Sequence, residues 1–244
     1  MGSKAGVGFS DAADSFAAGA QAAQQAMATT RLTRADAALL FSTGRHNPQK
    51  LRDGVRSVIG QACRLFGGYG VGIITHDKLA YDGHEVGIAI IQSDTWKIDA
   101  VIEPGLPGNE REVGVRLGEK LVATGLHPDD DLMLLYDTVN TSGGQPKLNM
   151  ATPLVAGMSE HVKEWPETAG MGMIGDMQLQ PTHQFFDDRI EQGSAMAIRF
   201  GGELRMDSII MHGCRPAGRY YTITLTDGPT VLEIDGKPAL HVIH

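Results

Sequence analysis

The internal repeat of this chain constrains its fold more than any other feature. Residues 36–43 (DAALLFST) align without a gap on residues 131–138 (DLMLLYDT), and in each segment an aspartate is followed by a largely apolar run of strand length. A glycine-rich segment follows each of them, GGYGVG at 67–72 and GMGMIG at 170–175. Two copies of one order of elements must bury their sheets under helices or against one another. The sequence therefore predicts a layered fold with pseudo-twofold symmetry.

The segments around these matches predict the repeat unit. Ala-rich or amphipathic patterns indicate helices over Ser10–Thr29, Pro48–Cys63, Asn109–Thr124 and Leu148–Lys163. Short apolar runs indicate strands over Asp36–Ser42, Leu65–Thr75, Glu85–Gln92, Leu132–Thr138, Gly170–Gly175 and Ser194–Phe200. We predict a single domain, 1–244, of the α/β (α+β) class. It is a layered sandwich of two helix–strand–helix–strand–strand repeats, at about 10–95 and 109–205, followed by C-terminal strands in 206–244 (SIIMHGC, YYTITLT and TVLEID).

Charge and hydropathy exclude two classes of partner. The chain of 244 residues carries 21 Lys and Arg against 29 Asp and Glu, a formal net charge of -8, and its basic residues are scattered. Binding to nucleic acid needs clustered basic residues for the phosphates, so we expect no nucleic-acid partner. No apolar run approaches the roughly 18 residues of a membrane span. The N-terminus also lacks the apolar core of a secretory signal. We expect a cytoplasmic protein without a membrane partner.

Polar loops follow the first strand of each repeat, STGRHN at 42–47 and DTVNTSGG at 137–144. Ligands of α/β sheets bind beyond the carboxyl ends of strands, where helices begin. Such loops could hold an anionic ligand, although ordinary loops that cap the following helix stay an equal alternative. A carboxylate together with guanidinium groups would suit a zwitterionic ligand. We expect one ligand cavity between the repeats, with contacts from Arg45, His46, Gly68, Tyr69, Asp137, Asn140, Cys214 and Arg215.

The nine histidines and two cysteines leave further chemistry open. No HExxH, CxxC or paired-histidine motif is present, so we expect no metal site and no cofactor. A haem group stays an alternative, because one axial histidine needs no sequence partner. Cys63 is expected to be a buried small residue. His212 and Cys214 would share one side of a strand, and Arg215 would favour a thiolate. His212 and Cys214 form the alternative catalytic set. The competing interpretation is that Cys214 is simply packed inside the fold.

Several motifs together resemble the FIST family of sensory domains. HGCRPAG (212–218) is followed by VLEIDGKPAL (231–240), while ALLFSTGRH (38–46) and FGGYGVGIIT (66–75) match the family's N-terminal half in order and spacing. The resemblance implies a signal-input domain that binds small ligands such as amino acids. In some bacterial members it implies haem-based sensing of nitric oxide, with a histidine kinase as partner. The family normally continues into a C-terminal half, so we expect the natural protein to continue past His244.

These observations predict a small-ligand-binding sensory domain for an amino-acid-like or other small polar ligand. A haem-based nitric-oxide sensor and a hydrolase or lyase that uses Cys214 and His212 are the alternatives. A homodimer is a further expectation, because an open edge strand invites pairing with a second copy.

Overall fold

A computed structural model describes residues 2–81, 83–141, 143–144, 146–180, 182–210, 213–228 and 230–243. The chain divides into two compact units, Met1–Ser208 and Ile209–His244. Each unit is described by itself.

The first sheet of unit one has six strands. Their order is β1 (Lys4–Ser10), β6 (Val86–Gln92), β2 (Ala37–Ser42), β3 (Arg64–Tyr69), β12 (Gln184–Phe186) and β13 (Arg189–Glu191). β2 and β3 are parallel, and every other neighbouring pair is antiparallel. The βαβ connection from β2 to β3 therefore forms the centre of this sheet.

The second sheet has four strands and repeats the topology of β1, β6, β2 and β3 in the first. Its order is β7 (Trp96–Pro104), β14 (Ser194–Gly202), β8 (Asp131–Asp137) and β11 (Glu167–Met173). β8 and β11 are parallel, and the two other pairs are antiparallel. Strands β7, β14, β8 and β11 thus correspond to β1, β6, β2 and β3. The repeat unit begins with a strand that the sequence patterns did not indicate.

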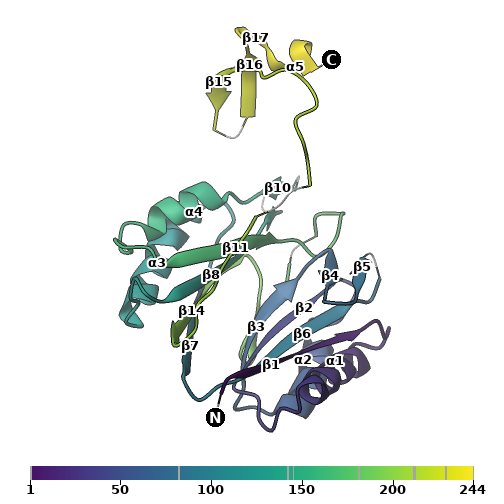
Figure 1. The fold of residues 1–244 in the computed structure, drawn as a ribbon. Coiled ribbons are helices and arrows are strands. Elements are labelled where there is room, and N and C mark those ends of the chain that lie inside the picture. Colours follow the sequence, from purple (N-terminus) through teal and green to yellow (C-terminus); the bar gives the residue numbers. More distant parts are fainter. Residues whose placement is uncertain are drawn as a thin grey trace. The chain divides into compact units, whose positions relative to one another are not determined.

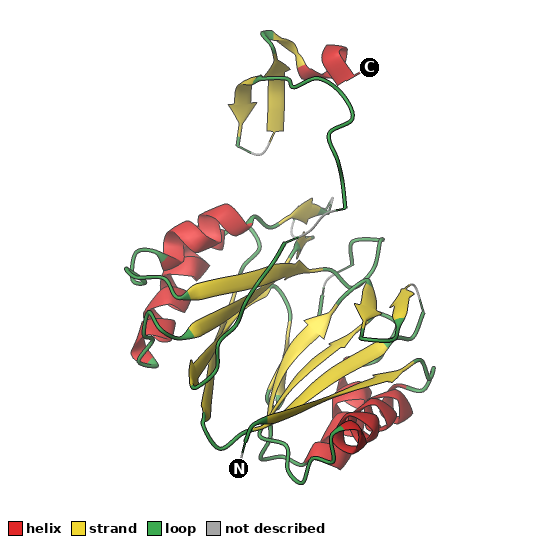
Figure 2. Ribbon diagram, viewed as in Figure 1, coloured by secondary structure: helices red, strands yellow, loops and turns green. Residues whose placement is uncertain are grey.

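Helices cover the outer faces of the two sheets (Figures 1 and 2). α1 (Ser15–Thr29) and α2 (Pro48–Ile59) pack on the first sheet through a core that includes Leu40 and Leu51. α3 (Glu110–Ala123) and α4 (Ala151–Met158) pack on the second sheet in the same way. The layers run helix, sheet, sheet, helix, which confirms the predicted layered α+β class.

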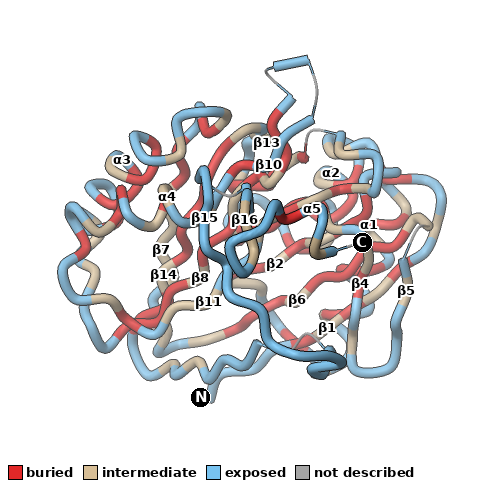
Figure 3. The backbone as a smooth tube through the Cα atoms, turned by 90° about the horizontal axis from the view of Figure 1, so that it is seen from above, coloured by how far each residue is buried: buried red, intermediate tan, exposed pale blue. Residues whose placement is uncertain are grey.

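A third core joins the inner faces of the two sheets. Phe66 of β3 and Phe186 of β12 pack there against residues of the second sheet such as Leu135 and Met196. The two phenylalanine rings meet edge to face, with centroids 5.7 Å apart. Figure 3 shows that the buried residues follow the strands of both sheets, while the connecting loops are largely exposed. The two repeats are therefore held together by apolar packing between their sheets.

Aligned aspartates hold the start of the central strand in each repeat. The carboxylate of Asp36 accepts a hydrogen bond from the backbone N–H of Ser93, which follows β6, at 2.8 Å. The carboxylate of Asp131 accepts one from the N–H of Met206, after β14, at 3.0 Å. The gapless match between 36–43 and 131–138 therefore reflects equivalent bonds in space.

Glycines at equivalent helix positions let each helix pair cross closely. A Cβ at Gly54 of α2 would lie 2.1 Å from the carbonyl oxygen of Phe16 in α1. A Cβ at Gly157 of α4 would lie 2.1 Å from the carbonyl oxygen of Arg111 in α3. Each glycine is the seventh residue of its helix, and each carbonyl belongs to the second residue of the other. Only glycine permits this backbone approach.

Several elements differ from the predicted ones. α1 begins at Ser15 rather than at Ser10, because the side chain of Asp14 caps it by accepting from the N–H of Ala17. α4 ends at Met158, five residues before Lys163. The glycine-rich segment 65–75 is not one strand: β3 ends at Tyr69, and a short hairpin follows, formed by β4 (Gly72–Ile74) and β5 (Leu79–Tyr81). A second hairpin, β9 (Val139–Asn140) and β10 (Lys147–Leu148), follows β8.

The second unit contains a small antiparallel sheet, β15 (Ile223–Asp227), β16 (Thr230–Ile234) and β17 (Lys237–Pro238), and the short helix α5 (Ala239–Ile243). The strands predicted in YYTITLT and TVLEID are confirmed. The strand predicted in SIIMHGC is wrong for the described residues 208–210 and 213–214, which form no strand. Among the helices of the described ranges, none combines the length and the apolar character needed to cross a membrane.

Candidate functional site

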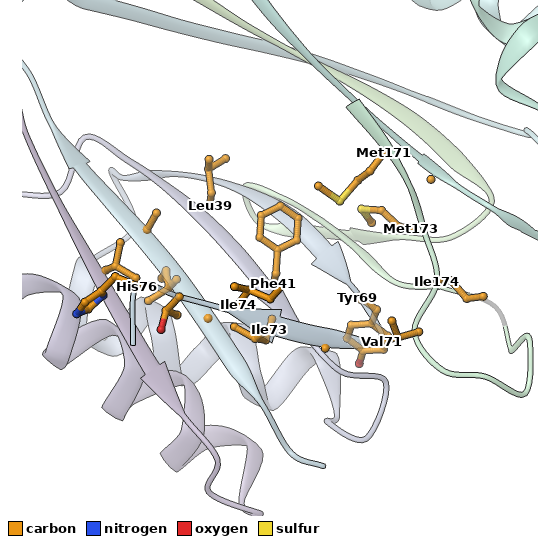
Figure 4. A pocket seen from close by; sticks show the side chains of 18 residues that line it. Leu39, Phe41, Tyr69, Val71, Ile73, Ile74, His76, Met171, Met173 and Ile174 are labelled. Carbon is orange, nitrogen blue, oxygen red and sulfur yellow. The ribbon is translucent and has the colours of Figure 1, made fainter. Parts of the chain in front are cut away.

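An apolar cavity of about 600 Å³ lies between the inner faces of the two sheets. It is lined by Val7, Leu39, Phe41, the segment 69–76, the segment 87–89 and the segment 171–174. We call it the main cavity. Figure 4 shows Met171 and Met173 of β11 opposite Leu39 and Phe41 of β2. The cavity is therefore walled by both repeats.

A second, more polar cavity of about 570 Å³ adjoins the main cavity at Val71, which lines both. We call it the polar cavity; its lining is Thr43, Gly44, Arg45, Val71, Tyr81, Gly175, Asp176, Met177 and Gln178. Two loops meet here, one following β2 and one following β11. The N–H of Gly44 donates to the carbonyl oxygen of Gly175 at 2.9 Å. A charged loop from one repeat thus lies beside a loop from the other.

The predicted site residue Gly68 lies in β3, where a side chain of the second sheet reaches the first. A Cβ at this position would lie 2.2 Å from the Cε of Met173 and 2.6 Å from the carbonyl oxygen of His183. The glycine therefore serves close packing beside the main cavity. It allows β12 to pair with β3 while Met173 of the second sheet reaches across.

The predicted site residue His46 is buried, and hydrogen bonds of its ring connect separate segments of the chain. Its Nε2 lies 2.9 Å from the carbonyl oxygen of His84, and its Nδ1 lies 3.2 Å from the hydroxyl of Ser15. Nε2–H is then the donor and Nδ1 the acceptor. Burial lowers the pKa of His46 below its ordinary value, a larger effect than the opposing hydrogen bond to His84. His46 therefore holds the start of α1 against two loops as a neutral ring.

Protonation of His46 should destabilise the fold. Its folded-state pKa is depressed below the unfolded value of about 6.5, so the unfolded chain binds more protons between these two values. We expect the free energy of unfolding to fall as the pH is lowered from 7 to 5, by up to about 1.4 kcal/mol per pH unit for each proton taken up. Burial lowers the pKa of His183 as well, which adds to the slope. Urea unfolding at a series of pH values measures it.

The variant His46→Gln should show a flatter dependence on pH, because glutamine does not titrate. The exposed His161 provides a matched control. In His161→Gln, the free energy of unfolding should depend on pH as it does in the parent chain. Equal slopes for the parent and His46→Gln would contradict the assignment of His46 as a buried neutral group.

Tyr69 connects the main cavity to the loop that carries Arg45. Its hydroxyl donates to the carbonyl oxygen of His46 at 2.5 Å, and its ring lies 5.1 Å from the ring of His183. Burial raises the pKa of this phenol. The tyrosine is thus a neutral, fixed wall of the main cavity.

Asp137 forms a structural network at the end of β8. Oδ1 accepts from the N–H of Val139 at 3.0 Å and from the hydroxyl of Thr182 at 2.8 Å. Oδ2 accepts from the N–H of Gly193 at 2.9 Å. The residue is 1% exposed, and its carboxylate joins three separate segments of the second repeat. Asn140, in β9, is also buried.

Of the eight predicted site residues, the structure brings Arg45 and Tyr69 to the linings of the two adjoining cavities. His46, Gly68, Asp137 and Asn140 are not among the described lining residues. Cys214 and Arg215 are exposed and belong to the second unit, and His212 of the alternative catalytic set lies outside the described residues. Cys63 is buried, as predicted, and burial raises the pKa of its thiol to about 12.

Most residues that line the main cavity were not predicted from the sequence, because they resemble core residues. Leu39 and Phe41 alternate along β2 with Leu40, which packs under the helices. Only the alternation of the strand indicates that they face the other side. Within the described ranges, no group of three or more His, Cys, Asp or Glu is placed to hold a metal ion.

The family model described as the FIST N domain matches residues 36–237. The chain belongs to the FIST N domain family. The match covers the first repeat from Asp36 onward and the whole of the second, and it confirms the resemblance that the motifs indicated.

Curated relatives of this FIST N domain protein include two from Mycobacterium tuberculosis. They are the uncharacterized proteins MT0656 of strain CDC 1551 and Rv0628c of strain H37Rv, each 31% identical over 85 residues. The match covers 34% of this chain and spans 22% of the length of each relative.

Two solved structures are similar to the chain at low sequence identity. One is the cyanuric acid hydrolase from A. caulinodans, with 10% identity and a TM-score of 0.40 over 81% of this chain and 71% of that one. The other is a second structure of cyanuric acid hydrolase, with 11% identity and a TM-score of 0.34 over 81% and 68%. These likenesses are too weak to bear on function.

Proposed function

We propose that this FIST N domain binds a small molecule in the main cavity and acts as the ligand-binding part of a sensory protein. The observation that carries the proposal is an apolar cavity of about 600 Å³ between the two sheets. Ligand sites are commonly concave, mostly apolar spaces of roughly 300–1,000 Å³. The adjoining polar cavity gives a charged end of the ligand a place beside Arg45.

Binding in this cavity provides a route to a signal. Its walls come from β2 and β4 of the first repeat and from β11 of the second. A ligand that contacts both repeats favours whichever arrangement of the two sheets gives it the better contacts. A signalling partner such as a histidine kinase would respond to that arrangement. We place this action in the cytoplasm, and a homodimer through an open sheet edge is part of the same proposal.

The amino-acid-like ligand expected from the family resemblance fits this arrangement in one form. An amino acid with a large apolar side chain would place that side chain in the main cavity and its charged end in the polar cavity. A small polar amino acid would leave the apolar walls in contact with water and gain little from them.

Thermal unfolding with a panel of small molecules tests the proposal. The panel should span amino acids, apolar acids, alcohols and sugars. A ligand at about 100 times its Kd stabilises the folded state by about 2.7 kcal/mol, which raises the melting temperature by roughly 5–10 °C for a chain of this size. The variant Ala89→Trp, on the cavity-facing side of β6, should remove this shift by filling the main cavity.

Ala28→Trp is the matched control, because Ala28 lies on the exposed side of α1. This variant should keep the ligand-induced shift of the parent chain. A shift that survives Ala89→Trp unchanged would place the ligand elsewhere, and the absence of any shift across the whole panel would overturn the proposal.

A haem group is the second candidate, and one observation favours it. His76 lines the main cavity and supplies the imidazole that an axial ligand requires. The apolar walls suit a porphyrin, whose iron would add gas binding. Its propionates would need the polar cavity. An absorbance spectrum with a Soret band after addition of haem, lost in His76→Ala, is the expected result for this candidate.

A further inference from the structure

We propose that the segment 70–81, which contains the hairpin β4–β5, is a lid that controls entry of the ligand into the main cavity. We call this segment the lid hairpin. The proposal rests on the proposed function and concerns the regulation of that same site. Three observations support it: the attachment of the lid hairpin at its two ends, the single side chain that holds it on the first sheet, and its place in the cavity wall.

The lid hairpin is attached to the end of β2 on both of its sides. Among the described strands, β4 and β5 pair only with each other. Where the hairpin begins, the N–H of Gly70 donates to the carbonyl oxygen of Ser42 at 2.7 Å. Just after the hairpin, the carbonyl oxygen of Gly83 accepts from the hydroxyl of Thr43 at 2.6 Å. Both attachments therefore lie at the base of the hairpin, where a hinge would have to be.

The turn of the lid hairpin is fixed by hydrogen bonds of its own. The N–H of Thr75 donates to the carbonyl oxygen of Lys78 at 2.9 Å, and the N–H of Lys78 donates to the hydroxyl of Thr75 at 3.1 Å. The same hydroxyl donates to the carboxylate of Asp77 at 2.9 Å. All of these bonds lie within the hairpin, so they are kept when it moves as one body.

One buried side chain holds the lid hairpin on the first sheet. Ile73 is 6% exposed, whereas the exposed fractions of Ile74, Leu79 and Tyr81 are 79%, 72% and 73%. Ile73 rests on β6 at Gly87, where a Cβ would lie 2.6 Å from its Cγ2. It belongs to none of the three cores that the described residues form. Gly87 thus leaves the space that Ile73 fills, and this contact acts as a latch.

The lid hairpin also forms much of one wall of the main cavity. Its first half, residues 70–76, lines the cavity. Figure 4 shows the hairpin side chains in a row along the cavity: Val71, Ile73, Ile74 and His76. Release of Ile73 from β6 would move this wall and open the cavity to solvent. A bound apolar molecule would cover the exposed Ile74, so that binding favours the closed hairpin.

The binding kinetics of anilinonaphthalene sulfonate, a dye that fluoresces in apolar surroundings, test the proposal. Stopped-flow measurements give its rates, and the signal that Ala89→Trp removes reports on the main cavity. Ile73→Ala should raise the association and dissociation rate constants alike, each by about tenfold or more, because the loss of a buried isoleucine favours the open hairpin. Since both rates rise, the Kd should change by less than about threefold.

Leu39→Ala is the matched control, because Leu39 lines the same cavity from the fixed strand β2. This variant should raise the dissociation rate constant and leave the association rate constant unchanged. An Ile73→Ala variant that behaves in the same way would show Ile73 to be an ordinary wall residue, and the lid would be overturned.

Gly87→Ala tests the latch from the opposite side. The added methyl group would displace Ile73 and should accelerate association as Ile73→Ala does. In the Ile73→Ala background, Gly87→Ala should have no further effect, because the side chain that it displaces is absent. Additive effects of the two substitutions on the association rate constant would overturn the assignment of this contact as the latch.

A measurement without ligand separates failure of the lid from failure of the proposed function. Spin labels at Lys78→Cys in the hairpin turn and at Glu119→Cys on the exposed side of α3 report the position of the hairpin by pulsed electron paramagnetic resonance. The background variant is Cys214→Ser, and the other native cysteine, Cys63, is buried.

Ile73→Ala and Gly87→Ala should broaden the distribution of distances between the labels, while Leu39→Ala should leave it unchanged. An unchanged distribution in both latch variants would overturn the lid, whatever the cavity binds. A broadened distribution without any Ala89-dependent binding, of the dye or of a compound in the thermal panel, would overturn the proposed function instead.

Discussion

Replacing Gly54 or Gly157 with alanine should destabilise the fold by about 3 kcal/mol and lower the melting temperature by roughly 6–12 °C. Each added methyl group would lie 2.1 Å from a backbone carbonyl oxygen of the facing helix, and a backbone cannot move aside as a side chain can. The sign is informative, because alanine stabilises an isolated helix by about 1 kcal/mol relative to glycine. Urea unfolding followed by far-ultraviolet circular dichroism measures the change.

Gly218→Ala is the control for this prediction. A Cβ at Gly218 would meet no atom within 4 Å, so the variant should change the stability by less than about 0.5 kcal/mol. If Gly54→Ala or Gly157→Ala instead gained stability, as the same change does in an isolated helix, the paired helices would have to lie farther apart at their crossing than they do in the structure.

Asp137→Ala should cost about 3 kcal/mol or more. The substitution removes the acceptor of three hydrogen bonds, from the N–H groups of Val139 and Gly193 and from the hydroxyl of Thr182. Each buried donor left without a partner costs about 1–3 kcal/mol. Asp137→Asn should be intermediate, because the amide keeps one acceptor oxygen and turns an NH₂ group toward a donor. Urea unfolding at pH 7 gives the free energies.

Asp129→Ala provides the comparison for this second prediction. The side chain of Asp129 is 79% exposed and pairs only with the ring of His127 among the described contacts. Its loss should change the stability by less than about 0.5 kcal/mol. If Asp137→Ala changed the stability as little as Asp129→Ala, the role of Asp137 in holding segments of the second repeat together would be contradicted.

The repeat and the layered class could be predicted because both depend on buried strands. An apolar run such as residues 37–42 is most stable when it is buried, and its partner at 131–137 carries the same pattern. The first strands, β1 and β7, lacked such a run. In β1, glycine alternates with Ala5, Val7 and Phe9, because α1 packs directly on the backbone at Gly6 and Gly8.

The candidate site was harder to predict, for two physical reasons. Asp137 carries a charge at the end of a strand, as a ligand-binding residue would, and only the fold brings it to the three donors that engage it. The residues of the main cavity have the opposite character. Phe41 and Met173 look like core residues, and whether they meet another side chain or an empty space depends on how far one sheet covers the other.

The hairpin β12–β13 has a consequence for synthesis on the ribosome. It belongs to the second repeat in the sequence but completes the first sheet by pairing with β3. During synthesis, Gly68 can therefore pair with Gln184 only after Gln184 has left the ribosome. Until then a nascent chain carries β3 as an unpaired edge, able to associate with other strands. The first repeat thus cannot reach its final form before most of the second has been translated. The β3–β12 pairing joins residues more than a hundred positions apart, and contacts of such long sequence separation form slowly during folding.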